Sequence, residues 1–239
     1  MFLLDLSLPS PEANLALDEA LLEQAEAGGR PWECLRLWEP AGAIVVIGRS
    51  SQLEQEASEA ACREWGAAIL RRVSGGAAIV AAPGCLMYGV VLSLELRPQL
   101  RAIDEAHRFV LGKLVEAIRP LAPQVERRGT SDLALGERKF SGNSLRIKRE
   151  HLLYHGTLLY DFPLELIGAC LRQPPRQPEY RAGRSHLDFV VNLPVDATSL
   201  RRALIAAWEA EEPLVDWPRE LTERLVAERY SQREWNYRR

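Results

Sequence analysis

The sequence has few of the residues that build metal centres or disulfide frameworks. Its 239 residues include only four cysteines and four histidines, and no cysteines form a Cys-x-x-Cys pair. Scattered cysteines without that spacing predict neither a zinc site nor a disulfide framework. His151 and His155 would share a face only on a helix, whereas their neighbours are typical of a strand. We therefore expect no metal site and mostly buried, apolar roles for the cysteines.

The chain also lacks a surplus of positive charge and a long apolar run. Its 30 basic and 33 acidic side chains give a formal net charge of −3, and generic nucleic-acid binding requires a basic surplus. No apolar stretch approaches the roughly 18 residues of a membrane span. The segment from Met1 to Pro9 has neither the basic start nor the cleavage pattern of a secretion signal. We expect a soluble, cytoplasmic protein with no nucleic-acid or membrane partner.

The apolar content, at 47%, is enough for one large domain with a sizeable core. Apolar residues at helical spacing predict helices near residues 15–28, 52–65, 103–118, 164–171, 197–211 and 219–229. Short apolar runs predict strands at 35–38 and 43–48, joined by a turn, and at 67–72, 87–94, 132–135, 139–140 and 152–160. The pattern predicts an α+β fold: a single domain over 1–239 whose mixed or antiparallel central sheet is flanked by helices. Its core would cover about residues 10–195, followed by a helical C-terminal extension over 196–239.

A glycine-containing segment is the first candidate for chemistry. It reads Arg71-Arg72-Val73-Ser74-Gly75-Gly76-Ala77-Ala78-Ile79-Val80. Glycines lack the Cβ atom that would keep a phosphate away from the backbone, and an arginine beside them can pair with phosphate through two hydrogen bonds. The alternative is an ordinary hairpin turn with surface arginines, because glycine pairs mark turns more often than binding sites.

A single lysine is the second candidate. Lys139 lies between Gly136 and Gly142, just ahead of an apolar strand. Most lysines are solvated surface charges, but this setting favours an ammonium group held against a partly desolvated site, where it would polarise a carboxylate or carbonyl. We expect Ser141 and Ser144 to satisfy backbone groups rather than act as nucleophiles, because no recognised nucleophile elbow surrounds them.

Four segments in this order resemble the lipoate-protein ligase A family, within the biotin/lipoate A/B ligase fold. They are Arg-Arg-x-Ser-Gly-Gly at 71–76, Thr-Ser-Asp-Leu at 130–133, Lys-Phe-Ser-Gly-Asn-Ser at 139–144 and His-Gly-Thr-Leu-Leu at 155–159. The resemblance covers roughly residues 10–195. It implies an enzyme that uses Mg²⁺ and ATP to activate lipoate or octanoate as an acyl-adenylate. Such an enzyme passes the acyl group to a lysine of a lipoyl carrier domain, in the glycine-cleavage carrier or a 2-oxoacid dehydrogenase acyltransferase.

The resemblance also implies roles for individual residues. Lys139 would be catalytic, holding the acyl carbonyl and the α-phosphate, while Arg72 would contact phosphate and Asp132 would lie near the target lysine or the adenylate. His155 would support the Lys139 segment. The full set expected to bind nucleotide or acyl-adenylate is Arg72, Ser74, Gly75, Gly76, Ala77, Ala78, Ile79, Val80, Asp132, Lys139, Asn143 and Ser144. The acyl tunnel would be lined by Leu70, Val90 and Leu158, which are otherwise ordinary core residues.

Three departures from the family pattern leave other functions open. Ala77 and Ala81 stand where the family commonly has a glycine and a histidine, and Cys85 follows Pro83 and Gly84. One alternative is an octanoyl or lipoyl transferase that uses an acyl-carrier-protein thioester through Cys85 as nucleophile, although a buried structural cysteine is the favoured interpretation. The other is a non-catalytic protein that binds a lipoyl group or an acyl-adenylate.

The region after Val195 has room for two or three helices rather than for the accessory domain of many ligases. We therefore expect the chain to work alone or with an accessory ligase subunit. The segments 174–181 and 229–239 are basic and aromatic. They are either a solvated loop and tail or a docking surface for an acidic carrier domain, by charge complementarity.

Overall fold

The computed structural model describes residues 1–174 and 176–238. Pro175 and Arg239, which belong to the two candidate docking segments, lie outside the described residues. The described chain forms an eight-stranded sheet and a separate three-stranded sheet. In order across the large sheet, the strands are β11 (Glu212–Pro213), β1 (Phe2–Asp5), β2 (Cys34–Trp38), β6 (Cys85–Ser93), β10 (His151–Leu159), β9 (Arg138–Ile147), β8 (Asp132–Leu135) and β7 (Val125–Arg128).

The large sheet is mixed, which confirms the predicted α+β class. Strand β1 runs parallel to β2 and β11, and the remaining neighbours are antiparallel. The small sheet was not predicted as a separate unit: β3 (Ile44–Ile47) lies between the parallel β4 (Ala68–Arg71) and the antiparallel β5 (Ile79–Ala81). Strands β2 and β3, predicted as two strands joined by a turn, therefore belong to different sheets.

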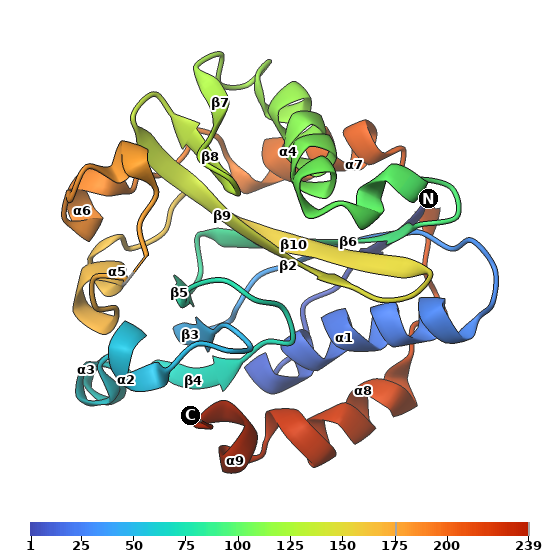
Figure 1. Ribbon diagram of the computed structural model, residues 1–239, viewed down its shortest axis with the longest axis horizontal. Helices are drawn as coiled ribbons and strands as arrows, with labels where there is room; N and C mark the ends of the chain where they lie inside the picture. The colour runs from blue at the N-terminus through green and yellow to red at the C-terminus, as the bar shows by residue number, and fades with distance from the viewer. Residues whose placement is uncertain (175, 239) are drawn as a thin grey trace.

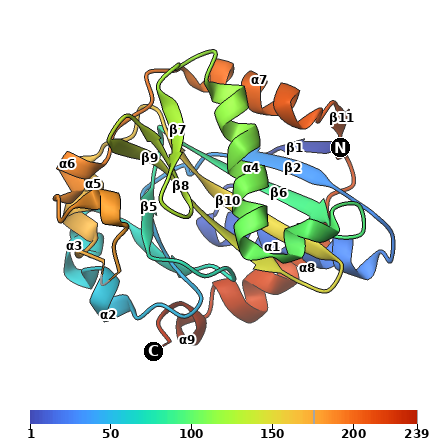
Figure 2. The same ribbon diagram turned by 45° about the horizontal axis from the view of Figure 1, so that its top comes forward.

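Helices cover both faces of the large sheet (Figure 1). Helices α4 (Ile103–Ile118) and α7 (Ala197–Trp208) lie on one face, and α1 (Pro11–Ala27) lies on the other with α8 (Arg219–Leu225) packed against it. Side chains alternate between the faces, as strand geometry requires. On β10, Tyr154 packs in the cluster under α4, whereas Leu153 packs with α1. Figure 2 shows α4 lying across the sheet.

The helix predicted over 52–65 is interrupted. Helix α2 (Leu53–Glu56) ends at Ala57, which is extended and forms a β-bridge with Leu171. Helix α3 (Glu59–Glu64) then starts afresh, with the Ser58 hydroxyl accepting a hydrogen bond from the Ala61 N–H. The remaining short helices are α5 (Glu165–Cys170), α6 (His186–Phe189) and α9 (Arg233–Asn236), with 3₁₀ turns at Pro98–Arg101 and Glu179–Arg181 and a π-helical turn at Val226–Tyr230.

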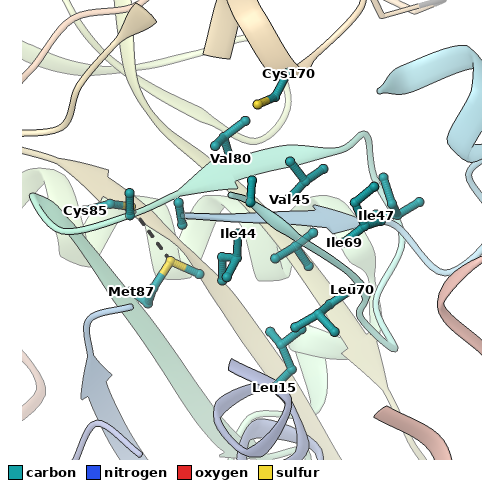
Figure 3. Packing of buried hydrophobic residues seen from close by; sticks show 14 of the residues in the cluster. Leu15, Ile44, Val45, Ile47, Ile69, Leu70, Val80, Cys85, Met87 and Cys170 are labelled. Carbon is teal, nitrogen blue, oxygen red and sulfur yellow. Dashed lines mark hydrogen bonds between the residues drawn. The ribbon is translucent and has the colours of Figure 1, made fainter. Parts of the chain in front are cut away.

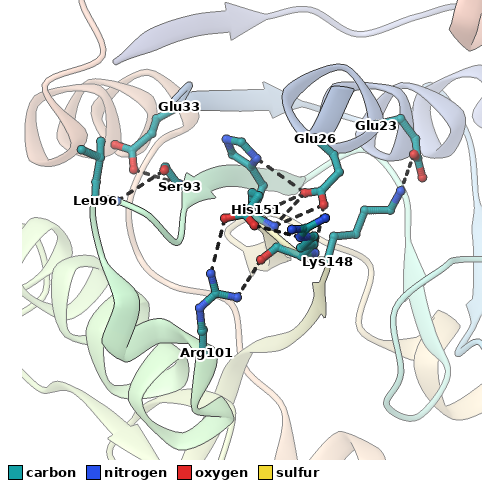
Figure 4. A network of polar contacts seen from close by, with 10 residues as sticks. Glu23, Glu26, Glu33, Ser93, Leu96, Arg101, Lys148 and His151 are labelled. Carbon is teal, nitrogen blue, oxygen red and sulfur yellow. Dashed lines mark hydrogen bonds and ion pairs between the residues drawn. The ribbon is translucent and has the colours of Figure 1, made fainter. Parts of the chain in front are cut away.

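The end of α1 anchors the turn between β9 and β10. The Glu26 carboxylate accepts hydrogen bonds from the backbone N–H groups of Arg149, Glu150 and His151, at 3.0, 3.1 and 3.1 Å (Figure 4). Nearby, the Lys148 ammonium pairs with Glu23. The two long strands that carry Lys139 and His155 are therefore fixed to the helix beneath them.

The small sheet packs its apolar side chains into one core cluster (Figure 3). Ile44, Val45 and Leu70 lie in it beside Leu15 of α1. The chain between β4 and β5 contains the two glycines, so the small sheet holds both ends of this segment. We call residues 72–77 the glycine turn.

Candidate functional site

Two adjoining cavities lie between the large sheet, the glycine turn and the segment after α5. The larger has a volume of about 440 Å³ and the smaller about 170 Å³. The larger is lined mainly by apolar side chains, among them Ile79, Phe140, Leu159, Ile167, Leu171, Phe189 and Val190. Both cavities are bordered by Ala77, Ala78, Ile79, Ser131, Asp132, Lys139, Gly142 and Thr157. A ligand could therefore extend from one cavity into the other past Lys139.

Lys139 lies within β9 rather than in a loop ahead of a strand. Strands β8 and β9 form a hairpin around Gly136, which has a positive φ of 60°. The hairpin brings the Lys139 ammonium to 2.7 Å from Asp132 Oδ1. The lysine side chain is 28% exposed and the aspartate side chain 8%. These two residues, each expected at the site, thus meet where the two cavities meet.

Two neighbours shape this ion pair. The Tyr180 hydroxyl donates a hydrogen bond to Asp132 Oδ2 at 2.9 Å, and burial, reinforced by the Asp132 charge, raises the pKa of Tyr180 well above its ordinary value. Tyr180 therefore acts as a donor at neutral pH. A Cβ atom at Gly142 would lie 2.9 Å from Lys139 Nζ, so the glycine makes room for the ammonium group.

Arg72 is buried and organises the glycine turn from inside. Its guanidinium donates to the backbone oxygens of Gly75 (2.5 Å), Ala77 (3.0 Å) and Val46 (3.1 Å). Burial, the largest cause, lowers its pKa to about 10, so the group stays charged at neutral pH. Because a peptide's C=O and N–H point in opposite directions, the Gly76 N–H points away from Arg72. The expected contact of Arg72 with phosphate stays a prediction.

Arg71 is also buried, so the interpretation of the pair as surface arginines is wrong. Its guanidinium donates to the backbone oxygens of Gly48 and Ser51, both at 2.7 Å, and of Arg238 at 2.8 Å. A Cβ atom at Gly48 would lie 1.9 Å from the Gly76 oxygen. The loop before α2 therefore packs directly on the glycine turn.

The pairing of β10 with β9 places His155 opposite Ser144, within the Lys139 segment that it was expected to support, and the His155 ring also contacts the glycine turn. Its Nε2 lies 2.6 Å from Ser74 Oγ and its Nδ1 lies 3.3 Å from Asp18 Oδ2. Ser74 is buried, with an exposed fraction of 1%. Ser74 holds the turn together and does not line either cavity among the described residues.

Asn143 and Ser144 border the smaller cavity, next to the glycine turn. Ser144 Oγ donates to the Gly75 oxygen at 2.9 Å, a backbone contact of the predicted kind. Asn143 Nδ2 donates to the Ser131 oxygen at 2.8 Å and so fixes the residue before Asp132. The two residues thus connect β9 to the segments on both sides of the cavity.

Cys85 lies in the core and not at either cavity. The residue is 0% exposed, and its sulfur is 3.8 Å from Met87 Sδ (Figure 3). Burial raises the pKa of this thiol well above its ordinary value, which disfavours the thiolate that a nucleophile needs. This geometry favours the structural interpretation of Cys85.

The residues expected to line an acyl tunnel are core residues instead. Leu70, Val90 and Leu158 are at most 2% exposed and line neither cavity. Leu158 points to the opposite face of β10 from its neighbour Leu159, which does line the larger cavity. Of this alternating pair, only Leu159 borders the larger cavity.

The segment after α5 supplies cavity residues that the sequence predicted only as part of a solvated loop or a docking surface. Arg181 borders the larger cavity, is 3% exposed, and its Nη2 has no hydrogen-bond partner. Its guanidinium lies over the Phe189 ring, 4.9 Å from the ring centre. Glu56 also borders this cavity and accepts a hydrogen bond from the Ala78 N–H. The larger cavity thus combines apolar walls with a buried guanidinium group, one nitrogen of which has no hydrogen-bond partner.

The two candidate docking segments are not simply solvent-exposed chain. The described part of 174–181 walls the larger cavity, with Pro174, Arg176 and Pro178 on its lining. In the C-terminal segment, Tyr230 and Asn236 are buried, and the Tyr230 hydroxyl donates to Glu19 at 2.8 Å. A role of either segment in docking a carrier stays a prediction.

Within the residues described, no three or more His, Cys, Asp or Glu side chains are grouped so that they could hold a metal ion. The four cysteines are buried, and none forms a disulfide. None of the described helices combines the length and apolar character that crossing a membrane requires.

Known proteins are similar to this chain in sequence. A putative lipoate-protein ligase A from Aeropyrum pernix is 31% identical over 150 residues, which cover 63% of this chain and 54% of that protein. The chain thus spans about half the length of that relative. Octanoyltransferase LipM from Geobacillus kaustophilus is 24% identical over 267 residues, covering 96% of this chain and 95% of that protein.

Solved structures show the same fold. A bipartite lipoate protein ligase from Thermoplasma acidophilum, described together with its E2 lipoyl domain, has a TM-score of 0.82 at 24% identity, covering 99% of this chain and 95% of that one. A lipoate-protein ligase A bound with ATP has a TM-score of 0.77 at 25% identity, covering 99% and 98%. The model of the lipoyl protein ligase A/B catalytic domain matches residues 10–207. This chain therefore belongs to the lipoyl protein ligase A/B catalytic domain family.

Proposed function

We propose that this protein is an ATP-dependent lipoate or octanoate protein ligase. The observation that carries the proposal is the position of Lys139 at the junction of an apolar cavity and a cavity bordered by the glycine turn. An acyl chain fits the first environment and a nucleotide phosphate the second. Their reacting ends, a carboxylate and an α-phosphate, would meet beside the lysine.

The chemistry that we propose has two steps. In the first, a carboxylate oxygen attacks the α-phosphorus of ATP, and pyrophosphate leaves. Lys139 would stabilise the negative charge on the carboxylate and the α-phosphate, and Arg181 offers a second cation through its unpartnered Nη2. Asp132, freed from Lys139, is the carboxylate best placed to meet a Mg²⁺ ion arriving with ATP.

In the second step, the amine of a carrier lysine attacks the acyl carbonyl, AMP leaves, and the amine loses a proton. We propose a lipoyl carrier domain as the acceptor and allow for an accessory subunit, because a similar protein is one part of a bipartite ligase studied with its E2 lipoyl domain. ATP is supported as a substrate by a similar lipoate-protein ligase A that was solved bound with ATP.

A thioester-dependent transferase through Cys85 is less well supported. An octanoyltransferase is among the proteins similar to this chain. Cys85, however, is fully buried and lines neither cavity. A non-catalytic protein that binds a lipoyl group or an acyl-adenylate is the remaining alternative, and turnover on a carrier domain separates it from the ligase.

Intact mass spectrometry of an apo lipoyl carrier domain tests the proposal. After incubation with this protein, lipoate and Mg-ATP, the carrier should gain the mass of one lipoyl group, and omitting ATP should abolish the gain. A gain without ATP from an octanoyl carrier-protein thioester, which Cys85→Ser removes, would replace the ligase with the transferase. Ligand binding without any gain would support the non-catalytic alternative.

A further inference from the structure

A buried chain of polar side chains runs from β2 and α1 through β10 to the glycine turn. It joins Arg36, Asp18, His155, Ser74 and Arg72, each with an exposed fraction of 8% or less. Burying charged and polar groups costs free energy that their mutual contacts only partly recover. A buried chain of this kind, next to a cavity, therefore needs a reason other than stability.

Ser74 is the link between the imidazole and the glycine turn. Arg72 Nε can only donate, so it donates to Ser74 Oγ at 3.0 Å. The Ser74 hydroxyl keeps its own hydrogen and one further acceptor position for His155 Nε2, 2.6 Å away. On its other side the imidazole faces Asp18, with Nδ1 3.3 Å from Oδ2.

Asp18 is held as a carboxylate by its other neighbour. Burial alone would raise its pKa, but the charge of Arg36 and the hydrogen bonds to His155 and Arg36 outweigh that effect and lower the pKa of Asp18 below its ordinary value. Arg36 pairs with Oδ1 and leaves Oδ2 to the imidazole. The contacts thus run in series from Arg36 through Asp18 and His155 to Ser74.

The order Asp18, His155, Ser74 resembles the contacts that activate a nucleophilic serine. A nucleophile must reach its substrate, whereas Ser74 is 1% exposed and lines neither cavity. The Ser74 oxygen also accepts a hydrogen bond from Arg72 Nε. The chain therefore ends in the loop and not at a reacting atom.

We propose that His155 is a positioning residue that sets the shape of the glycine turn through Ser74. Ser74 holds the Arg72 guanidinium, and Arg72 in turn draws the carbonyls of Gly75 and Ala77 inward. The N–H of Gly76 is thereby kept on the opposite side, available to an anion. The statement that this anion is a nucleotide phosphate rests on the proposed ligase function.

Calorimetric titration of ATP into the protein tests the inference. Ser74→Ala and His155→Ala should each weaken ATP binding about tenfold, the effect of losing one buried hydrogen bond. The double variant should also lose about tenfold rather than a hundredfold, because both changes break the same link. In transfer assays, the KM for ATP should rise by a similar factor while kcat changes less.

Replacements of different length separate positioning from simple packing. The side-chain amide of His155→Gln can place its oxygen or its nitrogen near the position of Nε2 and keep a hydrogen bond to Ser74, so its ATP affinity should lie within about threefold of wild type. His155→Asn is too short to reach Ser74 and should behave like His155→Ala. A purely structural role predicts no such order.

His107 provides a matched control. It is buried on α4, with Nδ1 2.8 Å from the Tyr154 hydroxyl, and borders neither cavity. His107→Ala should lower the melting temperature but leave ATP affinity unchanged. Unaltered ATP binding in Ser74→Ala and His155→Ala, or multiplicative losses in the double variant, would overturn the inference.

Hydrogen exchange separates this inference from the proposed function. Peptides that cover residues 73–77 should exchange faster in Ser74→Ala and His155→Ala, but not in His107→Ala, whether or not ATP binds. If the wild-type protein fails to bind ATP, the ligase proposal fails while this readout still decides the role of His155. Equal exchange in all the variants would refute the positioning role.

Discussion

Lys139 is the residue on which the proposed chemistry depends. Its ammonium contacts the Asp132 carboxylate, which Tyr180 also holds. A substrate carboxylate or phosphate would take the place that Asp132 occupies. The positive charge of the lysine would then always have an anion beside it. This arrangement keeps a cation ready at the junction of the two cavities.

Replacing this lysine should separate chemistry from folding. Lys139→Ala should lower the rate of acyl transfer by roughly a hundredfold or more, the usual effect of removing a charge-stabilising donor. The free energy of unfolding should fall by no more than about 1 kcal/mol, because the lysine is partly solvated. Transfer assays and urea unfolding followed by circular dichroism measure the two effects. A fully active variant would remove Lys139 from the mechanism.

Gly142 gives a subtler change at the same place. A Cβ atom there would lie 2.9 Å from Lys139 Nζ and 3.0 Å from Cε, the flexible end of the side chain. Gly142→Ala should therefore change stability little but displace the ammonium, lowering kcat about tenfold. Gly112→Ala on α4, where a Cβ would meet nothing within 4 Å, is the control with unchanged activity. Equal activities of the two variants would contradict the assigned contact.

Among the elements, α4 is joined to β10 by a titratable contact. His107 Nδ1 lies 2.8 Å from the Tyr154 hydroxyl. Burial, aided by the Arg127 charge, lowers the pKa of His107 below its ordinary value. The unfolded chain therefore binds the proton more tightly than the folded one, so stability is fully present above about pH 6.5 and falls as the pH drops toward the folded-state pKa.

This linkage predicts a pH-dependent difference between the wild-type protein and His107→Gln. The unfolding free energy of the wild type should decrease more steeply between pH 7 and about 5 than that of the variant, which has no proton to take up at this position. Chemical denaturation across this pH range measures both slopes. Parallel curves would mean that His107 keeps its ordinary pKa in the fold.

Elements with a strong periodic pattern or a clear apolar run were predictable from the sequence. The helix at 103–118 was predicted at both ends because its apolar spacing is regular and Pro120 follows it. The four-residue strands β3, β4 and β8 lie within predicted strands. Strands β1, β5 and β7 were not predicted, and β1 and β5 pair only with strands far along the chain.

At the site, residues of one hairpin were easier to predict together than residues from distant segments. The meeting of Asp132 and Lys139 follows from a hairpin that Gly136 marks in the sequence. Tyr180 reaches Asp132 and Arg181 reaches the larger cavity from a short 3₁₀ turn after α5, and no local pattern indicates where such a segment will lie. Choosing Leu158 instead of Leu159 for the acyl cavity reflects an ambiguity inherent in a strand whose two faces are both buried.

For the whole molecule, the C-terminal segment is part of the support for the site. Arg71 donates to backbone oxygens at Trp235 and Arg238, and the Trp235 indole N–H donates to the Arg71 oxygen at 2.8 Å. These contacts join α9 to the strand that leads into the glycine turn. Residues far apart in the sequence are thereby connected across the small sheet (Figure 1).

Breaking this contact should lower the stability of the whole fold. Trp235→Ala should reduce the unfolding free energy by about 2 kcal/mol or more, through lost packing and an unpaired Arg71 carbonyl. Trp65→Ala removes a side chain of a residue that is 46% exposed and should have little effect. Thermal and urea unfolding compare the two. Equal stability of the variants would mean that the C-terminal segment does not brace the fold.

The most direct test of the central claim is the lipoate-dependent exchange of labelled pyrophosphate into ATP, measured on the isolated protein. This reaction reports adenylate formation alone, without any carrier domain. The account predicts exchange that requires lipoate or octanoate and is lost in Lys139→Ala. Absence of exchange in the wild type, together with octanoyl transfer from a carrier-protein thioester, would contradict it.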